Sequence, residues 1–212
     1  MTDDLIDRLT RDLRPVGPGV VARRLILALA IGGAVALAGM ALVLGFRPDL
    51  ATATASRMFW MKLAYTLGFA GLGLWCVARL GRPGLSAAGR LPWLLAPLVG
   101  VAPMVAMQLI RTPSAAWRPL VMGDSAMVCP WRILAVALPV FAALIWALRT
   151  LAPTRPRLAG AMAGLTAGGL GAAVYALHCP ETGAPFLAIW YTLGILAPCA
   201  LGALAGPRLL RW

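Results

Sequence analysis

The stretch that decides the fold is LILALAIGGAVALAGMALVLGF, which runs from Leu25 to Phe46 without a charged residue. A helix needs about 20 apolar residues to cross the hydrocarbon core of a bilayer, so this stretch can span it with some tilt. Arg24 precedes the stretch and Arg47 follows it, as is typical of the two ends of a transmembrane segment. We therefore expect the first transmembrane helix over residues 25–46.

Five further apolar stretches follow, separated by short segments that contain Pro, Gly and Arg. They cover about residues 59–80, 91–110, 131–151, 158–177 and 185–205. Lys62 lies close to the start of the second stretch, where we expect its amine to reach outward to the lipid headgroups. The sequence thus predicts an all-α, polytopic bundle of six spans over 25–206, with a tail at 1–24 and a short C-terminal segment at 207–212.

The composition supports a membrane protein. Hydrophobic residues make up 61% of the chain and the mean hydropathy is +0.84, which leaves too few polar side chains to cover a soluble globule of this size. The net charge of +12 would also suit nucleic acid. Because the arginines bracket the apolar stretches, we interpret them as orientation signals beside anionic lipid, with no direct contact to nucleic acid.

The distribution of basic residues predicts the orientation, because cytoplasmic loops carry an excess of Arg and Lys. The side that holds both termini carries thirteen basic residues: Arg8, Arg11, Arg14, Arg23, Arg24, Arg79, Arg82, Arg90, Arg149, Arg155, Arg157, Arg208 and Arg211. The other side carries six: Arg47, Arg57, Lys62, Arg111, Arg118 and Arg132. We therefore expect both termini in the cytoplasm and the chain in a bacterial inner membrane.

The acidic residues argue against two function classes. All seven lie outside the expected spans: Asp3, Asp4, Asp7, Asp12, Asp49, Asp124 and Glu181. Proton-coupled transport normally needs ionisable groups at membrane depth, so it is disfavoured. Hydrolytic chemistry is disfavoured too, because the chain has one histidine and no recognisable nucleophile motif. We expect no enzymatic activity.

Small residues recur at helix-packing spacing in the last two spans. The stripe in the fifth consists of Gly160, Gly164, Gly168, Ala172 and Ala176, and the one in the sixth consists of Gly194, Pro198, Gly202 and Gly206. Two interpretations fit: close approach of helix backbones in lipid, or the chance pattern of an Ala- and Gly-rich chain.

Two of the four cysteines lie at the outer ends of spans. Cys129 begins the fourth span and Cys179 follows the fifth, so antiparallel helices would put both thiols at one membrane depth, within disulfide range if the helices are neighbours. Three interpretations stay open: a structural disulfide, an accessible redox or thiol-reactive sensor with a thiolate stabilised by His178 or Arg132, and a transient soft-metal site of Cys129, Cys179 and His178, with Glu181 nearby. No other cofactor is expected. Cys76 and Cys199 fall within spans, and we interpret them as packing residues.

The N-terminal tail carries an amphipathic pattern over about residues 3–14. The residues Leu5, Ile6, Leu9 and Leu13 fall on one helical face, and Pro15 ends the pattern. A helix of about three turns is marginal alone, so some surface must stabilise it. That surface is either the inner leaflet or a groove on a partner protein.

The tail motif Leu9-Thr10-Arg11-Asp12-Leu13-Arg14-Pro15, the six spans and the outer Cys129-Pro130 and His178-Cys179-Pro180-Glu181 segments together resemble the NrsF family of bacterial membrane anti-sigma factors. The resemblance implies a protein that holds an extracytoplasmic-function sigma factor at the inner face and releases it under heavy-metal or oxidant stress. Cys129 and Cys179 would then be the sensing thiols. The sigma-factor contact would include Leu5, Leu9, Asp12, Leu13, Arg14 and Pro15.

The alternative is a small membrane transporter or a thiol oxidoreductase with a structural disulfide. An oxidoreductase would be expected to carry a Cys-x-x-Cys pair, which is absent from the sequence. The oligomeric state cannot be predicted, because glycine-striped helices suit a dimer as well as a single bundle.

Overall fold

The computed structural model describes residues 19–82 and 87–211, and every regular element within those ranges is helical. Six helical segments there are long and apolar enough to cross a membrane, which confirms the expected all-α fold with six spans. The amphipathic helix expected over 3–14 lies outside the described residues. The side of the membrane on which the termini lie stays a prediction.

The six long segments overlap the six expected stretches. They are α2 (Val20–Val43), α4 (Arg57–Leu80), η1 with α5 (Ala88–Leu95 and Ala96–Arg111), α7 (Cys129–Arg149), α8 (Pro156–Tyr175), and the continuous run of α9 (Ala184–Phe186), η3 (Leu187–Tyr191) and α10 (Thr192–Leu209). The third segment begins as a 3₁₀ helix that contains Pro92. The sixth contains the π-helical turn η3.

The connection from Pro113 to Asp124, one of the segments that separate the expected spans, contains two short helices. They are η2 (Ser114–Ala116) and α6 (Trp117–Met122), and a further short helix, α3 (Leu50–Ala53), precedes α4. The indole nitrogen of Trp117 donates to the carbonyl oxygens of Leu109 and Thr112, at 3.2 and 3.0 Å. These bonds fix the turn after α5, which could not be predicted from Pro and Gly alone.

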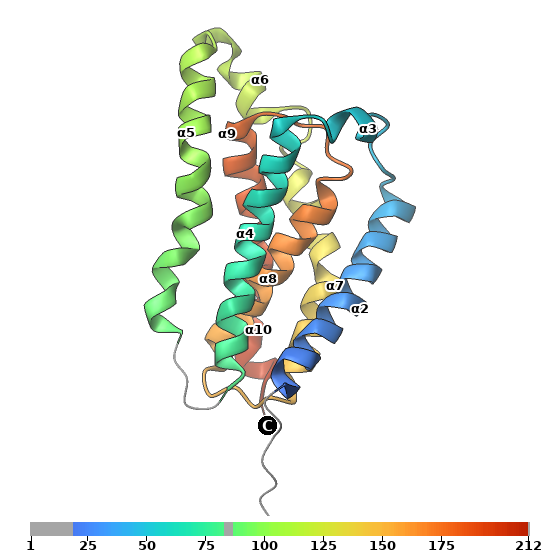
Figure 1. Cartoon of the computed structure of the whole chain (residues 1–212), viewed down its shortest axis with the longest axis vertical. Helices are drawn as coiled ribbons and strands as arrows, with labels where there is room; N and C mark the ends of the chain where they lie inside the picture. Colours follow the sequence, from blue (N-terminus) through green and yellow to red (C-terminus); the bar gives the residue numbers. More distant parts are fainter. Residues whose placement is uncertain (1–18, 83–86, 212) are drawn as a thin grey trace, which may run out of the picture.

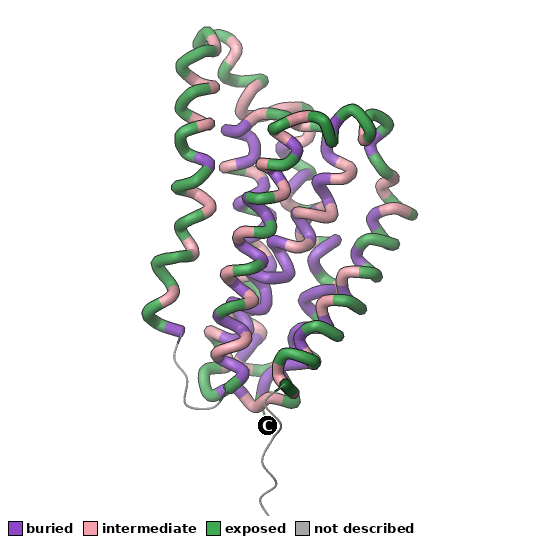
Figure 2. Tube along the Cα trace, viewed as in Figure 1, coloured by how far each residue is buried: buried purple, intermediate pink, exposed green. Residues whose placement is uncertain are grey.

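Helix α8 forms the centre of the bundle, with α4, α7 and α10 packed around it. Helix α2 packs on the outer side of α7, and α5 packs mainly against α4 at the periphery (Figure 1). Figure 2 shows the consequence for burial: α8 is buried along nearly its whole length, whereas α5 is exposed on most of its surface. Large apolar side chains such as Ile26, Ile31 and Ile110 point outward from the peripheral helices, as expected of surfaces that face lipid.

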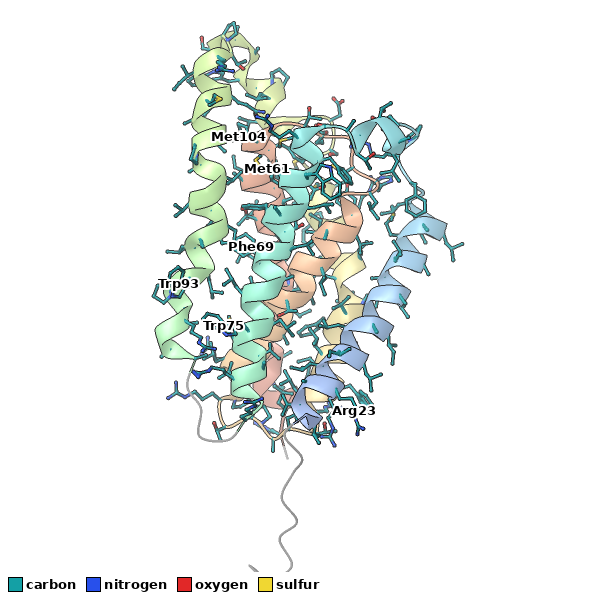
Figure 3. The ribbon with its side chains drawn as sticks, viewed as in Figure 1. Arg23, Met61, Phe69, Trp75, Trp93 and Met104 are labelled. Carbon is teal, nitrogen blue, oxygen red and sulfur yellow. The ribbon has the colours of Figure 1, made fainter. Side chains whose placement is uncertain are left out.

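Helices α4 and α5 run antiparallel. Trp75 of α4 and Trp93 of η1 both lie in the lower half of the view, and Met61 and Met104 both lie in the upper half (Figure 3). The Arg90 guanidinium stacks on the Trp75 ring, 3.6 Å from its centroid, and so joins η1 to α4.

Glycine contacts explain how α8 packs so closely. A Cβ atom at Gly164 would lie 2.0 Å from the carbonyl oxygen of Pro198, and one at Gly160 would lie 2.2 Å from that of Gly202. The glycine stripes of α8 and α10 therefore face each other with backbone in contact, which confirms the packing interpretation over chance. On another side of α8, Gly171 meets Ala137 of α7 in the same way.

We name the two ends of the bundle by their residues. The basic end contains Val20, Leu80, Arg149, Pro156 and Leu209, where α2 and α8 begin and α4, α7 and α10 end. The thiol end contains the opposite termini of the same helices, including Cys129 at the start of α7. The described chain begins and finishes at the basic end (Figure 1).

Candidate functional site

Cys129 and Cys179 meet at the thiol end. Cys129 is the first residue of α7, and Cys179 follows α8, whose last residue is Tyr175. Both are free thiols, and the Cys129 thiol donates a hydrogen bond to the Cys179 sulfur. The expectation that neighbouring antiparallel helices bring these two cysteines to one depth is therefore confirmed.

The two thiols are buried, so the expectation that they are accessible at a loop edge was wrong. Cys129 is 0% exposed and Cys179 is 1% exposed. They are covered because Lys62 of α4 and Tyr191 of η3, both themselves buried, lie around Cys179. A reagent must therefore pass protein side chains before it meets either sulfur.

Lys62 turns toward the protein interior, in contrast to the expected outward position. Its Nζ donates to the carbonyl oxygen of Cys179 at 3.2 Å and to that of Glu181 at 2.6 Å. The same Nζ lies 5.3 Å from the centroid of the Tyr191 ring. A buried amine is costly unless its protons find acceptors, and the two carbonyl groups supply them here.

Arg47, in the connection between α2 and α3, is the second cation at this site. Its NH1 donates to the same carbonyl oxygen of Cys179, at 3.3 Å. Its Nε and NH2 donate to the Asp49 carboxylate at 2.7 and 2.6 Å, and this bidentate pair raises the pKa of Arg47 and lowers that of Asp49. Two cations from separate elements therefore hold one peptide carbonyl.

The environment of Cys179 favours its thiolate. The hydrogen bond from the Cys129 thiol is the main cause that lowers the pKa of Cys179, and burial opposes it. The charge of Lys62 and a contact from the Tyr191 hydroxyl lower this pKa further. Lys62 thus takes the part that the sequence assigned to His178 or Arg132.

Tyr191 lies at the last position of the π-helical turn, a distortion that is common at functional sites. Its hydroxyl is the one buried side-chain oxygen or nitrogen, within the described part of the chain, that has no hydrogen-bond partner of ordinary geometry. It faces the Cys179 sulfur. A polar group left unpaired beside a thiol can accommodate a change in the charge or oxidation state of that sulfur.

The side chains of Glu181 and His178 make their hydrogen bonds away from the sulfurs. The Glu181 carboxylate accepts from the Asp124 amide at 2.9 Å and from the Ser125 hydroxyl at 3.0 Å, which ties the Cys179 loop to the segment before α7. The His178 ring makes a 2.9 Å hydrogen bond between Nδ1 and the carbonyl oxygen of Gly45.

The Nε2 atom of His178 lies 3.5 Å from NH1 of Arg132. Within residues 19–82 and 87–211, no three His, Cys, Asp or Glu side chains lie together as a metal-ligand group. The side chains of His178 and Glu181 bind Gly45, Asp124 and Ser125, and metal binding by Cys129, Cys179 and His178, with Glu181, stays a prediction.

A cavity of about 200 Å³ opens beside this cluster. Its walls include Arg47, Lys62, Glu181 and Thr182, which are the residues that surround the Cys179 loop, together with Asp49 and Ser56. The cavity therefore provides polar space next to the Lys62 side of the buried thiol pair.

The other two cysteines lie apart from this cluster. Cys76 is fully buried in α4 and Cys199 is half-buried in α10, positions consistent with packing. The expected sigma-factor contacts Leu5, Leu9, Asp12, Leu13, Arg14 and Pro15 lie outside the described residues. They precede α2, which begins at the basic end.

A family model described as "Negative regulator of sigma F", NrsF, matches residues 9–212. This chain belongs to the NrsF family. A relative from Caulobacter vibrioides named "Anti-sigma-F factor NrsF" is 46% identical over 218 residues, which cover 100% of this chain and 99% of the relative.

A second relative, from Azospira oryzae, is named "Probable anti-sigma-F factor NrsF" and is 42% identical over 211 residues, again 100% of this chain and 99% of the relative. No solved structure matches the chain. The family is one of regulators of a sigma factor, in agreement with the expected regulatory class.

Sequence reasoning missed Lys62, Arg47 and Tyr191 as parts of the site. The available signal was Lys62, which is the only lysine in the chain and stands inside an apolar stretch. An ionisable residue within a span is by default a candidate functional residue. The sequence interpretation instead placed the Lys62 amine at the lipid headgroups.

Proposed function

We propose that this protein is an inner-membrane anti-sigma factor that holds an extracytoplasmic-function sigma factor at its cytoplasmic basic end and releases it when Cys129 and Cys179 are oxidised. The single observation that carries the sensing half is the buried, hydrogen-bonded pair of free thiols beside Lys62. The family membership carries the sigma-factor half.

The chemical signal in this proposal is a hydroperoxide. Two thiols and one hydroperoxide give a disulfide, an alcohol and water, so the sulfurs lose two electrons and the O–O bond accepts them. An oxidant is favoured over a soft metal because His178 and Glu181, the expected additional ligands, are bound elsewhere.

Disulfide formation moves Cys129 and Cys179 toward each other at the thiol end. A disulfide bond is about 2 Å long, shorter than a hydrogen bond between two thiols, so its formation draws Cys129 and Cys179 together. Cys129 is the first residue of α7, and Cys179 belongs to a loop held by Lys62, Arg47 and Glu181. The start of α7 therefore has to shift against that loop.

Contacts along α7 offer a route from this shift to the basic end. A Cβ atom at Gly32 of α2 would lie 2.7 Å from the Cα atom of Val140, so α2 and α7 touch through their backbones. At the end of α7, Arg24 NH1 donates to the carbonyl oxygen of Thr150 at 2.9 Å. Because the tail leads directly into α2, a shift of α7 changes how the tail is presented to the sigma factor.

The test is co-purification through a tag at the N-terminus, from detergent-solubilised membranes with and without hydrogen peroxide. The proposal expects a sigma factor to be recovered from untreated membranes and lost after treatment, with the loss abolished in the Cys129→Ser, Cys179→Ser double variant. If no sigma factor is recovered under either condition, the proposal is wrong and solute transport becomes the function to assay.

A further inference from the structure

The two sulfurs of the pair have different surroundings. Cys179 accepts the hydrogen bond from Cys129, and the Tyr191 hydroxyl faces its sulfur. Its carbonyl oxygen accepts from both Lys62 and Arg47, at 3.2 and 3.3 Å. Cys129, by contrast, is the first residue of α7, and its own carbonyl oxygen accepts from neither Lys62 nor Arg47.

We propose, on the basis of the function proposed above, that Cys179 is the thiol that attacks the oxidant, that Cys129 is the thiol that resolves the product, and that Lys62 is the positioning residue that creates this difference. A nucleophilic sulfur needs a nearby positive charge and a hydrogen-bond donor, and Cys179 has both. Cys129 has the position of a resolving thiol, in hydrogen-bond contact with the first sulfur.

The two steps balance with a hydroperoxide as the oxidant. The Cys179 thiolate attacks one peroxide oxygen, the S–O bond forms and the O–O bond breaks, which leaves a sulfenic acid on Cys179 and an alkoxide that water protonates. The Cys129 sulfur, after giving up its proton, then attacks the Cys179 sulfur. The S–S bond forms, and the sulfenic hydroxyl leaves with that proton as water.

The cavity of about 200 Å³ gives the oxidant a place on the Cys179 side of the pair. Lys62 and Arg47 line it and also hold the Cys179 carbonyl, and Glu181 and Thr182 follow Cys179 in the chain. Neither thiol lines this cavity, so the final approach to the sulfur requires a small displacement of the Lys62 side chain or of the loop.

Lys62 acts through position and charge rather than through contact with the oxidant. It fixes the loop by one hydrogen bond to the carbonyl oxygen of Cys179 and one to that of Glu181, and it places a positive charge in a region of low dielectric, where its influence on a thiolate is strong. Replacement by methionine removes both effects with a similar side-chain length, whereas replacement by arginine keeps the charge. Arg57, exposed at the start of the same helix, offers the matched control.

The test uses the purified full chain in detergent, hydrogen peroxide as the oxidant and dimedone to trap sulfenic acid, with mass spectrometry to locate it. In the Cys129→Ser variant, which keeps a hydroxyl donor, we expect dimedone on Cys179. In the Cys179→Ser variant, we expect labelling of Cys129 to be slower by about tenfold or more. Equal or faster labelling of Cys129 would overturn the assignment of the attacking thiol.

The part played by Lys62 is tested in the Cys129→Ser background. Lys62→Met should slow the labelling of Cys179 by about tenfold and shift the pH profile of that labelling to higher pH. Lys62→Arg should restore most of the rate. Arg57→Met should change neither the rate nor the pH profile. An unchanged labelling rate and pH profile in a Lys62→Met protein that elutes from size-exclusion chromatography like the wild type would overturn the proposed role of Lys62. If Lys62→Met does not fold, either of two other results would overturn the role of Lys62. One is an unaltered labelling rate of Cys179 in Lys62→Ala. The other is a labelling rate of Cys179 in Lys62→Arg that is as low as the labelling rate of Cys129 in the Cys179→Ser variant.

These measurements need no sigma factor. A negative result in these measurements therefore does not decide the co-purification test. Conversely, retention of the sigma factor after oxidation would not contradict the order in which the two thiols react.

Discussion

The Nζ atom of Lys62 lies 3.2 Å from the carbonyl oxygen of Cys179, and both residues are buried. This contact joins α4 to the loop after α8, at the point where α7 begins with Cys129. The only lysine of the chain is thereby placed beside its only adjacent pair of thiols among the described residues.

The hydrogen bond between the thiols should control the pH dependence of Cys179. Because a donor stabilises the thiolate, Cys129→Ala should raise the pKa of Cys179, and alkylation by iodoacetamide at a fixed neutral pH should become slower. Cys129→Ser should keep most of the rate, because its hydroxyl can donate. Mass spectrometry of the labelled peptide over a pH series measures both, and an identical profile in the two variants would contradict the role of the hydrogen bond.

The Glu181 carboxylate should restrain access to Cys179. Glu181→Ala removes the acceptor for the Asp124 amide and the Ser125 hydroxyl, so the loop should open more often and alkylation of Cys179 should become several-fold faster. Glu181→Gln keeps an oxygen acceptor and is the control. Gly123→Ala should act like Glu181→Ala, because its backbone has φ +51° and a Cβ atom there would lie 2.3 Å from the carboxylate.

The contact between α8 and α10 should tolerate no added methyl group. Gly164→Ala places a Cβ atom 2.0 Å from the Pro198 carbonyl oxygen, so the helices must separate, at a cost of about 1–3 kcal/mol in the free energy of unfolding. Gly33→Ala, where no atom lies within 4 Å of the added carbon, should be neutral or slightly stabilising. Thermal unfolding in detergent compares them, and equal midpoints would contradict the packing described for α8.

Much of this fold could be predicted from the sequence. Long uncharged stretches such as 25–46 can satisfy their backbone in lipid only as helices, so six spans followed from hydropathy alone. The stripe at Gly160, Gly164 and Gly168 indicated a close helix contact. The structure identifies the partner as α10, with Pro198 and Gly202 opposite the stripe. The indole nitrogen of Trp190 in the π-helical turn η3 donates to the carbonyl oxygen of Val121 in the short helix α6, a contact between distant residues that local patterns do not encode.

The site could be predicted only in part. Antiparallel spans were enough to put Cys129 and Cys179 at one depth, but only the structure shows that α7 and α8 are neighbours and bring the two thiols together. The direction of a long side chain was not predictable, since Lys62 can reach either water or an inward carbonyl from the same backbone position. His178 and Glu181 stand next to Cys179 in sequence, yet bind elsewhere.

Substitutions in the tail should remove the sigma-factor contact without changing the reactivity of the thiols. Leu9→Glu with Leu13→Glu should abolish recovery of the sigma factor, because both leucines belong to the apolar face of the expected helix. Dimedone labelling of the thiols should be unaltered in that variant. Arg8→Ala, on the polar face, is the control, and loss of binding in the control but not in the double variant would contradict the assigned face.

The most direct test of the central claim is a titration with hydrogen peroxide of the complex between this protein and its sigma factor in lipid nanodiscs. The fraction of chains with a Cys129–Cys179 disulfide, from intact mass, and the fraction of sigma factor still bound are measured in the same samples. The account predicts that the bound fraction falls in proportion as the disulfide fraction rises, and that a reductant reverses both. A disulfide that forms fully while the sigma factor remains bound would contradict it.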